Sequence, residues 1–179
     1  MESSAEQSRK KAMVTAAAVY RNRTRGTALL AGSAMASLLL GVGVYLIGRD
    51  WGSVLFLQPF AALQPSWNIA AMPAGAWLPS LLHAYGFALL IILMLRPHPR
   101  APVYGASGWL LIAALLEWLQ STPAEALILS MYRLPGTGPV PGLVEAYVIH
   151  GRFDSGDLLA AALGCLAAFA AAHTVEVPK

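Results

Sequence analysis

Six polar side chains stand in or beside long apolar stretches of this sequence, where such groups are costly to bury. They are His83, Glu117, Gln120, Arg152, Asp154 and Asp157. An imidazole and a carboxylic acid in one place could act as general acid and base, and a guanidinium beside them could hold an anionic group. Ionisable residues within membrane spans are rare and usually mark functional sites. Such a site requires a fold that brings the six side chains together.

The composition is that of an integral membrane protein. Of the 179 residues, 57% are hydrophobic and only 12% are charged, which is about half the charged fraction of a soluble domain. Four apolar stretches are each long enough to cross a hydrocarbon core of roughly 30 Å as a helix. They are Thr27–Gly48, Trp77–Leu95, Tyr104–Gln120 and Gly156–Thr174. We therefore predict an all-α integral membrane protein with four transmembrane helices.

The basic residues predict how these spans are oriented. Nine of the 12 Lys and Arg residues precede the first span, separate the second from the third, or end the chain. The other three are Arg49, Arg133 and Arg152. By the positive-inside rule both termini are cytoplasmic, and the loops 49–76 and 121–155 face outward.

This topology divides the chain into three parts. They are a basic cytoplasmic N-terminal tail (1–26), a four-helix transmembrane domain (27–174) and a cytoplasmic C-terminal tail (175–179). The first span is interpreted as a retained anchor, because no small-residue cleavage site follows it. A basic stretch beside a span favours anionic lipid head groups as its partner, and not nucleic acid.

The two outward loops are predicted to form short helices on the extracytoplasmic membrane surface. The first loop is apolar, but prolines prevent one continuous helix there. They are Pro59, Pro65 and Pro73. In the second loop, Ser121 or Thr122 could cap a short helix that has Pro123 at its first position.

Small residues in the first and fourth spans predict close helix packing. In the first span they are Gly32, Ala36, Gly41 and Gly43, and in the fourth Ala160, Gly164 and Ala168. Spacings of about four residues place such side chains on one helix face, where two backbones can approach closely. The single Cys165 lies among Ala and Leu residues of the fourth span, so we expect a small buried side chain.

The topology also predicts that the six polar side chains share one depth in the outer leaflet. His83 lies about two turns inside the second span, and Glu117 and Gln120 share a face at the outer end of the third. Asp154 and Asp157 share a face at the outer start of the fourth span, directly after Arg152. Three helices thus bring their polar residues to one level.

Most of these residues have a plainer, structural interpretation as well. Asp154 could be the N-cap of the fourth span, with Asp157 at the third helical position. Gln120 could simply end a helix at the interface, and His83 could hydrogen-bond between helices. Glu117 is flanked by apolar residues and needs a partner or a proton. Its candidate partners are His83 and Arg152.

The order of these residues resembles the VanZ-like family of small bacterial membrane proteins. The matching stretches are LPSLLHAYGFALL, LLEWLQ and GRFDSGDLLAAALG, which include the packing residue Gly164. Three features depart from the family pattern. Pro79 and Ser80 stand where an Asp and a Lys commonly precede the His, Ala residues replace a common Asn before the final Gly, and the gap from Gln120 to Arg152 is unusually long.

The resemblance implies a protein of the bacterial cytoplasmic (inner) membrane with a role in the cell envelope, related in its namesake to glycopeptide (teicoplanin) resistance. We expect the polar site to bind, and in an enzymatic form to process, a lipid or lipid-linked envelope precursor. His83 or Glu117 would then serve as the catalytic acid or base. Arg152 would hold an anionic head group such as a phosphate. Asp154 and Asp157 would position a hydroxyl or a cation, and Gln120 would also contribute to substrate binding.

Two other classes of function compete with this one. The chain could be a non-catalytic accessory or assembly subunit of a membrane complex, with a membrane protein or a second copy as its partner. A metal or haem site would use His83, His150 and the two Asp residues, but no ligand spacing marks one, so no cofactor is expected. A lone four-span chain without repeats or broken helices is also a poor candidate for a transporter.

Overall fold

The computed structural model describes residues 2–48, 51, 58–63, 73–132 and 153–176. All regular structure in these residues is helical. The helices are α1 (Glu2–Gly48), η2 (Gln58–Leu63, a 3₁₀ helix), α2 (Pro73–Met94), α3 (Ala101–Leu119), α4 (Thr122–Tyr132) and α6 (Ser155–Glu176). The all-α prediction is confirmed for the described part of the chain.

Four of the helices are long and apolar enough to cross a membrane. These stretches are Glu6–Gly48, Trp77–Met94, Ala101–Leu119 and Ser155–Val175. The second, third and fourth lie within a few residues of the predicted spans. The chain is therefore built as a multi-pass membrane protein would be.

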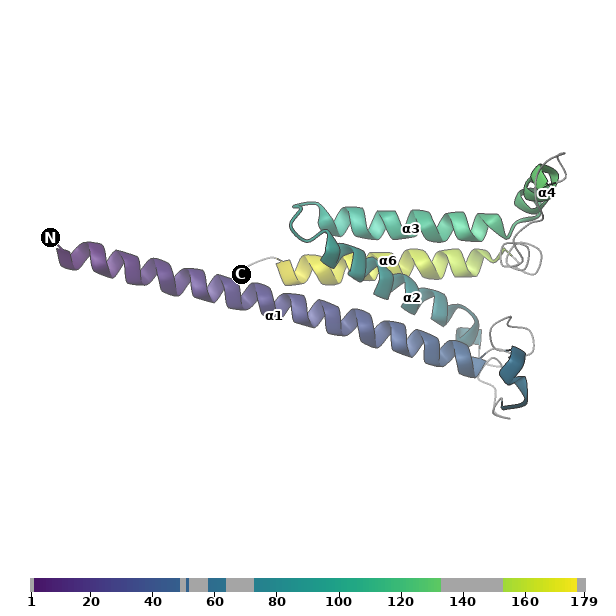
Figure 1. The fold of residues 1–179 in the computed structure, drawn as a ribbon, viewed down its shortest axis with the longest axis horizontal. Helices are drawn as coiled ribbons and strands as arrows, with labels where there is room; N and C mark the ends of the chain where they lie inside the picture. The colour runs from purple at the N-terminus through teal and green to yellow at the C-terminus, as the bar shows by residue number, and fades with distance from the viewer. Residues whose placement is uncertain (1, 49–50, 52–57, 64–72, 133–152, 177–179) are drawn as a thin grey trace.

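The four long helices lie side by side, and the short helices gather at one end of the bundle (Figure 1). η2 and α4 both lie at the end where α1 finishes and α6 begins. A short helix after Gln120 was predicted, and α4 confirms it. Its predicted side-chain cap is wrong for Ser121, whose carbonyl accepts the Glu125 N–H at 3.0 Å. The buried Ser121 hydroxyl has no hydrogen-bond partner among the described residues.

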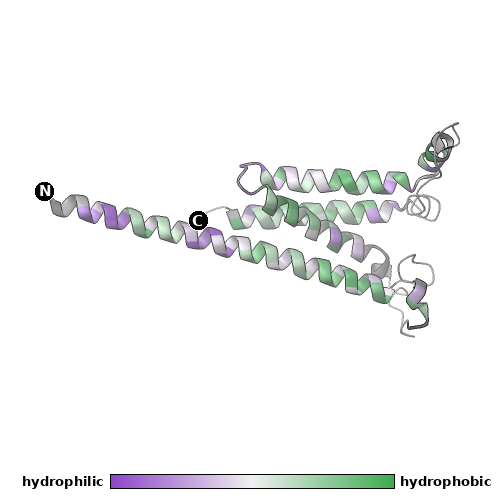
Figure 2. Cartoon of the chain, in the orientation of Figure 1, coloured by the Kyte–Doolittle hydropathy of each residue, from purple (hydrophilic) through white to green (hydrophobic). Residues whose placement is uncertain are grey.

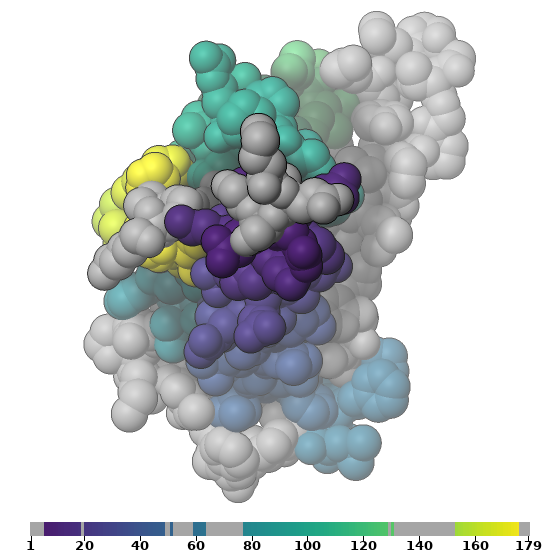
Figure 3. Space-filling view, turned by 90° about the vertical axis from the view of Figure 1, so that its left-hand side faces the viewer, coloured from purple at the N-terminus to yellow at the C-terminus, as the bar shows by residue number. Residues whose placement is uncertain are grey.

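The segment 2–26, expected as a tail, continues the first span as one α-helix of 47 residues. No Gly or Pro interrupts the chain before Gly26, and Ala, Lys and Arg favour helix. Lys10 and Glu6, one turn apart, form an ion pair of 2.7 Å. This part projects beyond the bundle in Figure 1, and in the end-on view of Figure 3 it points toward the viewer.

The core of the bundle is built around α2, which packs against α1, α3 and α6. Most buried side chains are small, and Leu89 and Ile92 are the largest that are fully buried. Cys165 is buried among them, as predicted. Large apolar side chains instead cover the outside of the bundle, where Leu39, Leu111 and Leu166 are more than half exposed. Figure 2 shows that apolar residues predominate along the four long helices within the bundle, and a bilayer would cover those that are exposed.

Glycines set how closely the helices approach one another. A Cβ added at Gly164 of α6 would meet the backbone of Leu81 and Tyr85 in α2. Gly105 of α3 is packed in the same way against Ile92 of α2. Close packing of the fourth span through Gly164 is therefore confirmed.

The predicted packing face of the first span is only partly right. Gly41 lies against α2, but a Cβ at Gly32 or Gly43 would meet nothing within 4 Å. The buried residues of α1 between Gly26 and Gly41 instead follow another stripe, consisting of Leu30, Ala34 and Ser37. Two polar bonds fix this face on α2. Ser37 Oγ donates to the Leu82 carbonyl at 2.8 Å, and the Ser33 and Tyr85 hydroxyls are 2.7 Å apart.

Candidate functional site

The start of α6 carries the first part of the candidate site. Asp154 precedes the helix, and its Oδ1 accepts the Gly156 N–H at 2.7 Å. Its carbonyl oxygen accepts the Leu158 N–H at 3.3 Å. Asp154 is thus the N-cap of α6 and satisfies an amide that has no partner within the helix. Asp157 stands in the first turn, where the helix dipole favours a negative charge.

Glu117, near the end of α3, joins this N-cap. Its Oε2 accepts the backbone N–H of Asp154 at 3.1 Å. The Phe153 N–H donates to the Gln120 carbonyl at 3.2 Å. These two bonds fasten the last turn of α3 to the start of α6. The predicted partners of Glu117 were His83 and Arg152. Arg152 lies outside the described residues, and among the described residues the hydrogen-bond partner of Glu117 is the Asp154 amide and not His83.

Asp157 connects α6 to α2. Its Oδ1 accepts a hydrogen bond of 2.8 Å from the Ser80 hydroxyl. The sequence showed Ser80 only as a departure from the VanZ-like pattern. One signal could have identified it, because Ser80 and His83 are three residues apart and therefore neighbours on one helix face. Both aspartates therefore have a structural role. Asp154 caps the start of α6, and Asp157 joins α6 to α2.

The imidazole of His83 lies against α1. A Cβ built on Gly41 would be 3.1 Å from His83 Nε2, and the His83 ring centre is 6.3 Å from that of Phe87. Phe87 in turn stacks on Trp109 of α3 at 4.5 Å. Among the described residues, no hydrogen bond or ion pair joins His83 to Glu117. The two predicted catalytic groups are therefore on neighbouring helices but not paired.

Three carboxyl groups form an acidic cluster, which we define as Glu117, Asp154 and Asp157. Glu117 Oε2 lies 3.1 Å from the Asp154 backbone nitrogen, and Asp157 stands in the first turn of α6, three residues after Asp154, so the three groups gather at one end of the bundle. Within the described part of the chain, each accepts one hydrogen bond, whereas a carboxylate offers about four acceptor positions. The cluster can therefore accept further bonds from hydroxyl or amine groups.

Of the other predicted site residues, the structure describes Gln120 but not Arg152 or His150. Gln120 is half-buried at the C-terminal end of α3, and its backbone carbonyl has a defined partner. Within the described ranges, no three His, Cys, Asp or Glu side chains are arranged to hold a metal ion.

No protein-family model, curated protein or solved structure matches this chain. The resemblance to the VanZ-like family consequently stays a prediction, based on the residues quoted for it. The function has to be inferred from the geometry at this end of the bundle.

Proposed function

We propose that this chain is a VanZ-like protein of a bacterial cytoplasmic membrane that binds the polar head of a lipid or lipid-linked envelope precursor. The site is the acidic cluster at the end of the bundle where α6 begins. One observation carries the proposal. Polar side chains from three helices meet there, through the Ser80–Asp157 bond and the bond from the Asp154 N–H to Glu117.

The proposed orientation places this end at the outer leaflet. The long second loop contains α4, and the first contains η2, at this same end (Figure 1). Most of the arginines lie near the other end, as the positive-inside rule requires of a cytoplasmic face. Trp77, 41% exposed at the start of its span, suits a membrane–water interface. We propose that η2 and α4 are interfacial helices.

The chemistry of the cluster indicates what the ligand offers. Carboxylates accept hydrogen bonds, so the complementary groups are the hydroxyls or amines of a sugar, glycerol or amino-containing head group. For a phosphate next to these hydroxyls or amines, the complementary residue is Arg152, since a guanidinium donates paired hydrogen bonds to a phosphate. Binding is the activity best supported, because His83 and Glu117 are not paired. Acid–base processing by either residue stays a prediction from the sequence.

Lipid identification by native mass spectrometry tests the proposal. Wild-type protein purified in nanodiscs would be compared with Glu117→Gln, which keeps an oxygen to accept the Asp154 N–H. Glu125→Gln in α4 is the matched control, because it removes a carboxylate from the same end but outside the cluster. We expect a specific lipid to be retained by the wild type and the control and lost from Glu117→Gln. Identical lipid profiles in all three proteins would refute the proposed site.

The second candidate is a non-catalytic accessory subunit, and the Ser80–Asp157 bond also supports it. This bond joins two helices directly, so the polar groups could serve mainly to hold the bundle in a shape that a partner recognises. Under this function, substitution of Asp157 or Glu117 lowers the amount of assembled complex. A specific lipid with no co-purifying protein would decide against it.

A further inference from the structure

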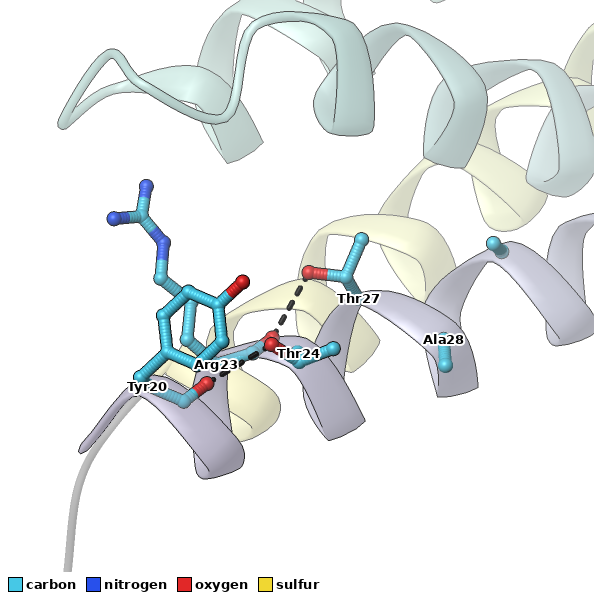
Figure 4. A pocket seen from close by; sticks show the side chains of 6 residues that line it. Tyr20, Arg23, Thr24, Thr27 and Ala28 are labelled. Carbon is cyan, nitrogen blue, oxygen red and sulfur yellow. Dashed lines mark hydrogen bonds between the residues drawn. The ribbon is translucent and has the colours of Figure 1, made fainter. Parts of the chain in front are cut away.

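A pocket of about 470 Å³ lies on α1 at the opposite end of the bundle from the acidic cluster. Its lining consists of Tyr20, Arg23, Thr24, Thr27, Ala28 and Ala31. These residues are three or four apart in sequence and so share one face of the helix, as Figure 4 shows. We call this the arginine pocket. It lies beside the stripe of α1 that packs on α2.

A second arginine reaches this pocket from α2. Arg96, just beyond the end of α2, donates a hydrogen bond to Thr27 Oγ1. A Cβ at Gly26 would lie 3.3 Å from Arg96 Nη2, so the guanidinium rests on α1 beside the pocket. Arg23 is exposed on the pocket wall. Two guanidinium groups therefore stand at this open pocket, Arg23 in its lining and Arg96 beside it.

The threonine hydroxyls of the pocket are not available as donors to a ligand. Thr24 Oγ1 donates to the Tyr20 carbonyl at 3.0 Å, and Thr27 Oγ1 donates to the Arg23 carbonyl at 2.9 Å. Each hydroxyl proton is thereby used within α1 (Figure 4). Donors for a ligand come from Arg23 and the Tyr20 hydroxyl, which line the pocket. The matching ligand is an anion.

The charge around the pocket is mainly positive. The stretches 20–31 and 94–104 contain five arginines and no acidic residue. Glu176 ends α6 at this end of the bundle. Five positive charges against one negative charge at the end of a membrane span attract anionic head groups.

The pocket is polar toward the N-terminal side of α1 and apolar toward the span, which matches the polar head and apolar chain of an amphiphile. Tyr20, Arg23, Thr24 and Thr27 form its polar part, and Ala28 and Ala31 begin the apolar surface of the span. A free phosphate would use only the first part. A phospholipid uses both, with its phosphate among the arginines and an acyl chain along the alanines. Tyr20, 74% exposed, is a residue type enriched at this interface.

We propose that the arginine pocket binds one anionic phospholipid molecule at this leaflet. Arg23 and the Tyr20 hydroxyl donate to the head-group phosphate, and Arg96 adds its charge from α2. The acyl chain lies against Ala28 and Ala31. This proposal is independent of the ligand at the acidic cluster, because the two sites lie at opposite ends of the bundle.

Titration of the delipidated full-length protein by native mass spectrometry tests this proposal. The probes are dioleoylphosphatidylglycerol and, for comparison, dioleoylphosphatidylcholine. We expect Arg23→Gln to weaken phosphatidylglycerol binding by about tenfold, the effect of losing a charged hydrogen bond to the ligand. Arg21→Gln is the matched control, since it removes the same charge from the same helix outside the pocket lining. Equal losses in the two variants would overturn the pocket and leave only diffuse charge attraction.

A second variant tests the pocket without changing any charge. Ala28→Phe fills the apolar part at an exposed position, so the bundle should fold and the lipid should be displaced. Unchanged phosphatidylglycerol binding by this variant would also overturn the proposal. Glycerol 3-phosphate distinguishes a lipid from a free phosphate. We expect that glycerol 3-phosphate, added at the same concentration as phosphatidylglycerol, does not displace the lipid. Displacement as effective as that by unlabelled phosphatidylglycerol would assign the pocket to a soluble phosphate ester.

Discussion

The two ends of the bundle hold their polar groups in different ways. At the acidic cluster, hydrogen bonds run between helices, from Ser80 to Asp157 and from the Asp154 amide to Glu117. At the arginine pocket, the threonine hydroxyls bond within their own helix, and Arg23 is exposed. Under our proposals, a polar group at the first end contributes both to packing and to ligand recognition. At the second end, Arg23 contributes to recognition alone.

This difference has a consequence for mutagenesis. Substitutions at the acidic cluster change stability and binding together unless the replacement keeps the hydrogen-bond acceptor. Substitutions of exposed residues at the arginine pocket change binding only.

The proposed orientation predicts an all-or-none difference in labelling. In a Cys165→Ala background, Ser155→Cys lies at the acidic end and His98→Cys in the turn between α2 and α3, and both positions are exposed. A membrane-impermeant thiol reagent added to intact cells should label only Ser155→Cys. Labelling of His98→Cys alone would reverse the orientation and place the acidic cluster at the cytoplasmic face.

Overpacking between α2 and α6 should have the largest effect on stability. Gly164→Leu forces a side chain into the backbone of Leu81 and Tyr85, at a cost of about 3 kcal/mol. Gly32→Leu is the matched control, because nothing lies within 4 Å of its added Cβ. Thermal unfolding in detergent should show a large decrease in melting temperature for the first variant and almost none for the second. Equal decreases would mean that α6 does not pack on α2 as described.

The Ser80–Asp157 bond should contribute a measurable coupling free energy. Interhelical hydrogen bonds in membrane proteins contribute about 0.6 kcal/mol on average and up to about 1.7 kcal/mol. A double-mutant cycle with Ser80→Ala and Asp157→Ala should give a coupling in this range. Asp157→Asn keeps an acceptor and should lose less stability than Asp157→Ala. A coupling free energy of zero would show that the Ser80–Asp157 bond does not stabilise the packing of α2 on α6, so that ligand binding would be the only proposed role of Asp157.

The ion pair in the projecting part of α1 should contribute least. Glu6 and Lys10 are 68% and 74% exposed in their side chains, and exposed pairs one helical turn apart contribute about 0.3–0.5 kcal/mol to their helix. Lys10→Ala should therefore leave the melting temperature of the bundle unchanged. A marked decrease would show that this segment packs against something that stabilises the whole protein.

The sequence predicted the spans well and the contacts within the site poorly. Span positions follow from apolar length, so three of them agree closely with α2, α3 and α6. The bond from the Asp154 N–H to Glu117 could not be predicted, because a backbone amide leaves no side-chain pattern to recognise. Ser80 was overlooked for a related reason, since a serine within a membrane helix commonly bonds to its own backbone.

Two further differences have physical causes. Small residues repeat at spacings of about four on two faces of the first span, and spacing alone does not decide which face meets α2. The stripe with Gly41 makes the contact, and Gly32 does not. The projecting part of α1 was expected as a tail because it is charged, but charge at exposed positions is compatible with a continuous helix when Gly and Pro are absent.

Photo-crosslinking tests the central claim, a lipid site at the acidic cluster, most directly. A benzophenone amino acid would replace Phe153, which is 44% exposed beside the cluster, or Met94, which is 81% exposed at the other end. After irradiation of living cells, mass spectrometry would identify the adducts. We expect a distinct lipid or lipid-linked precursor at position 153, absent from position 94 and lost when Glu117→Gln is added. The same bulk phospholipids at both positions, unaffected by Glu117→Gln, would contradict the claim.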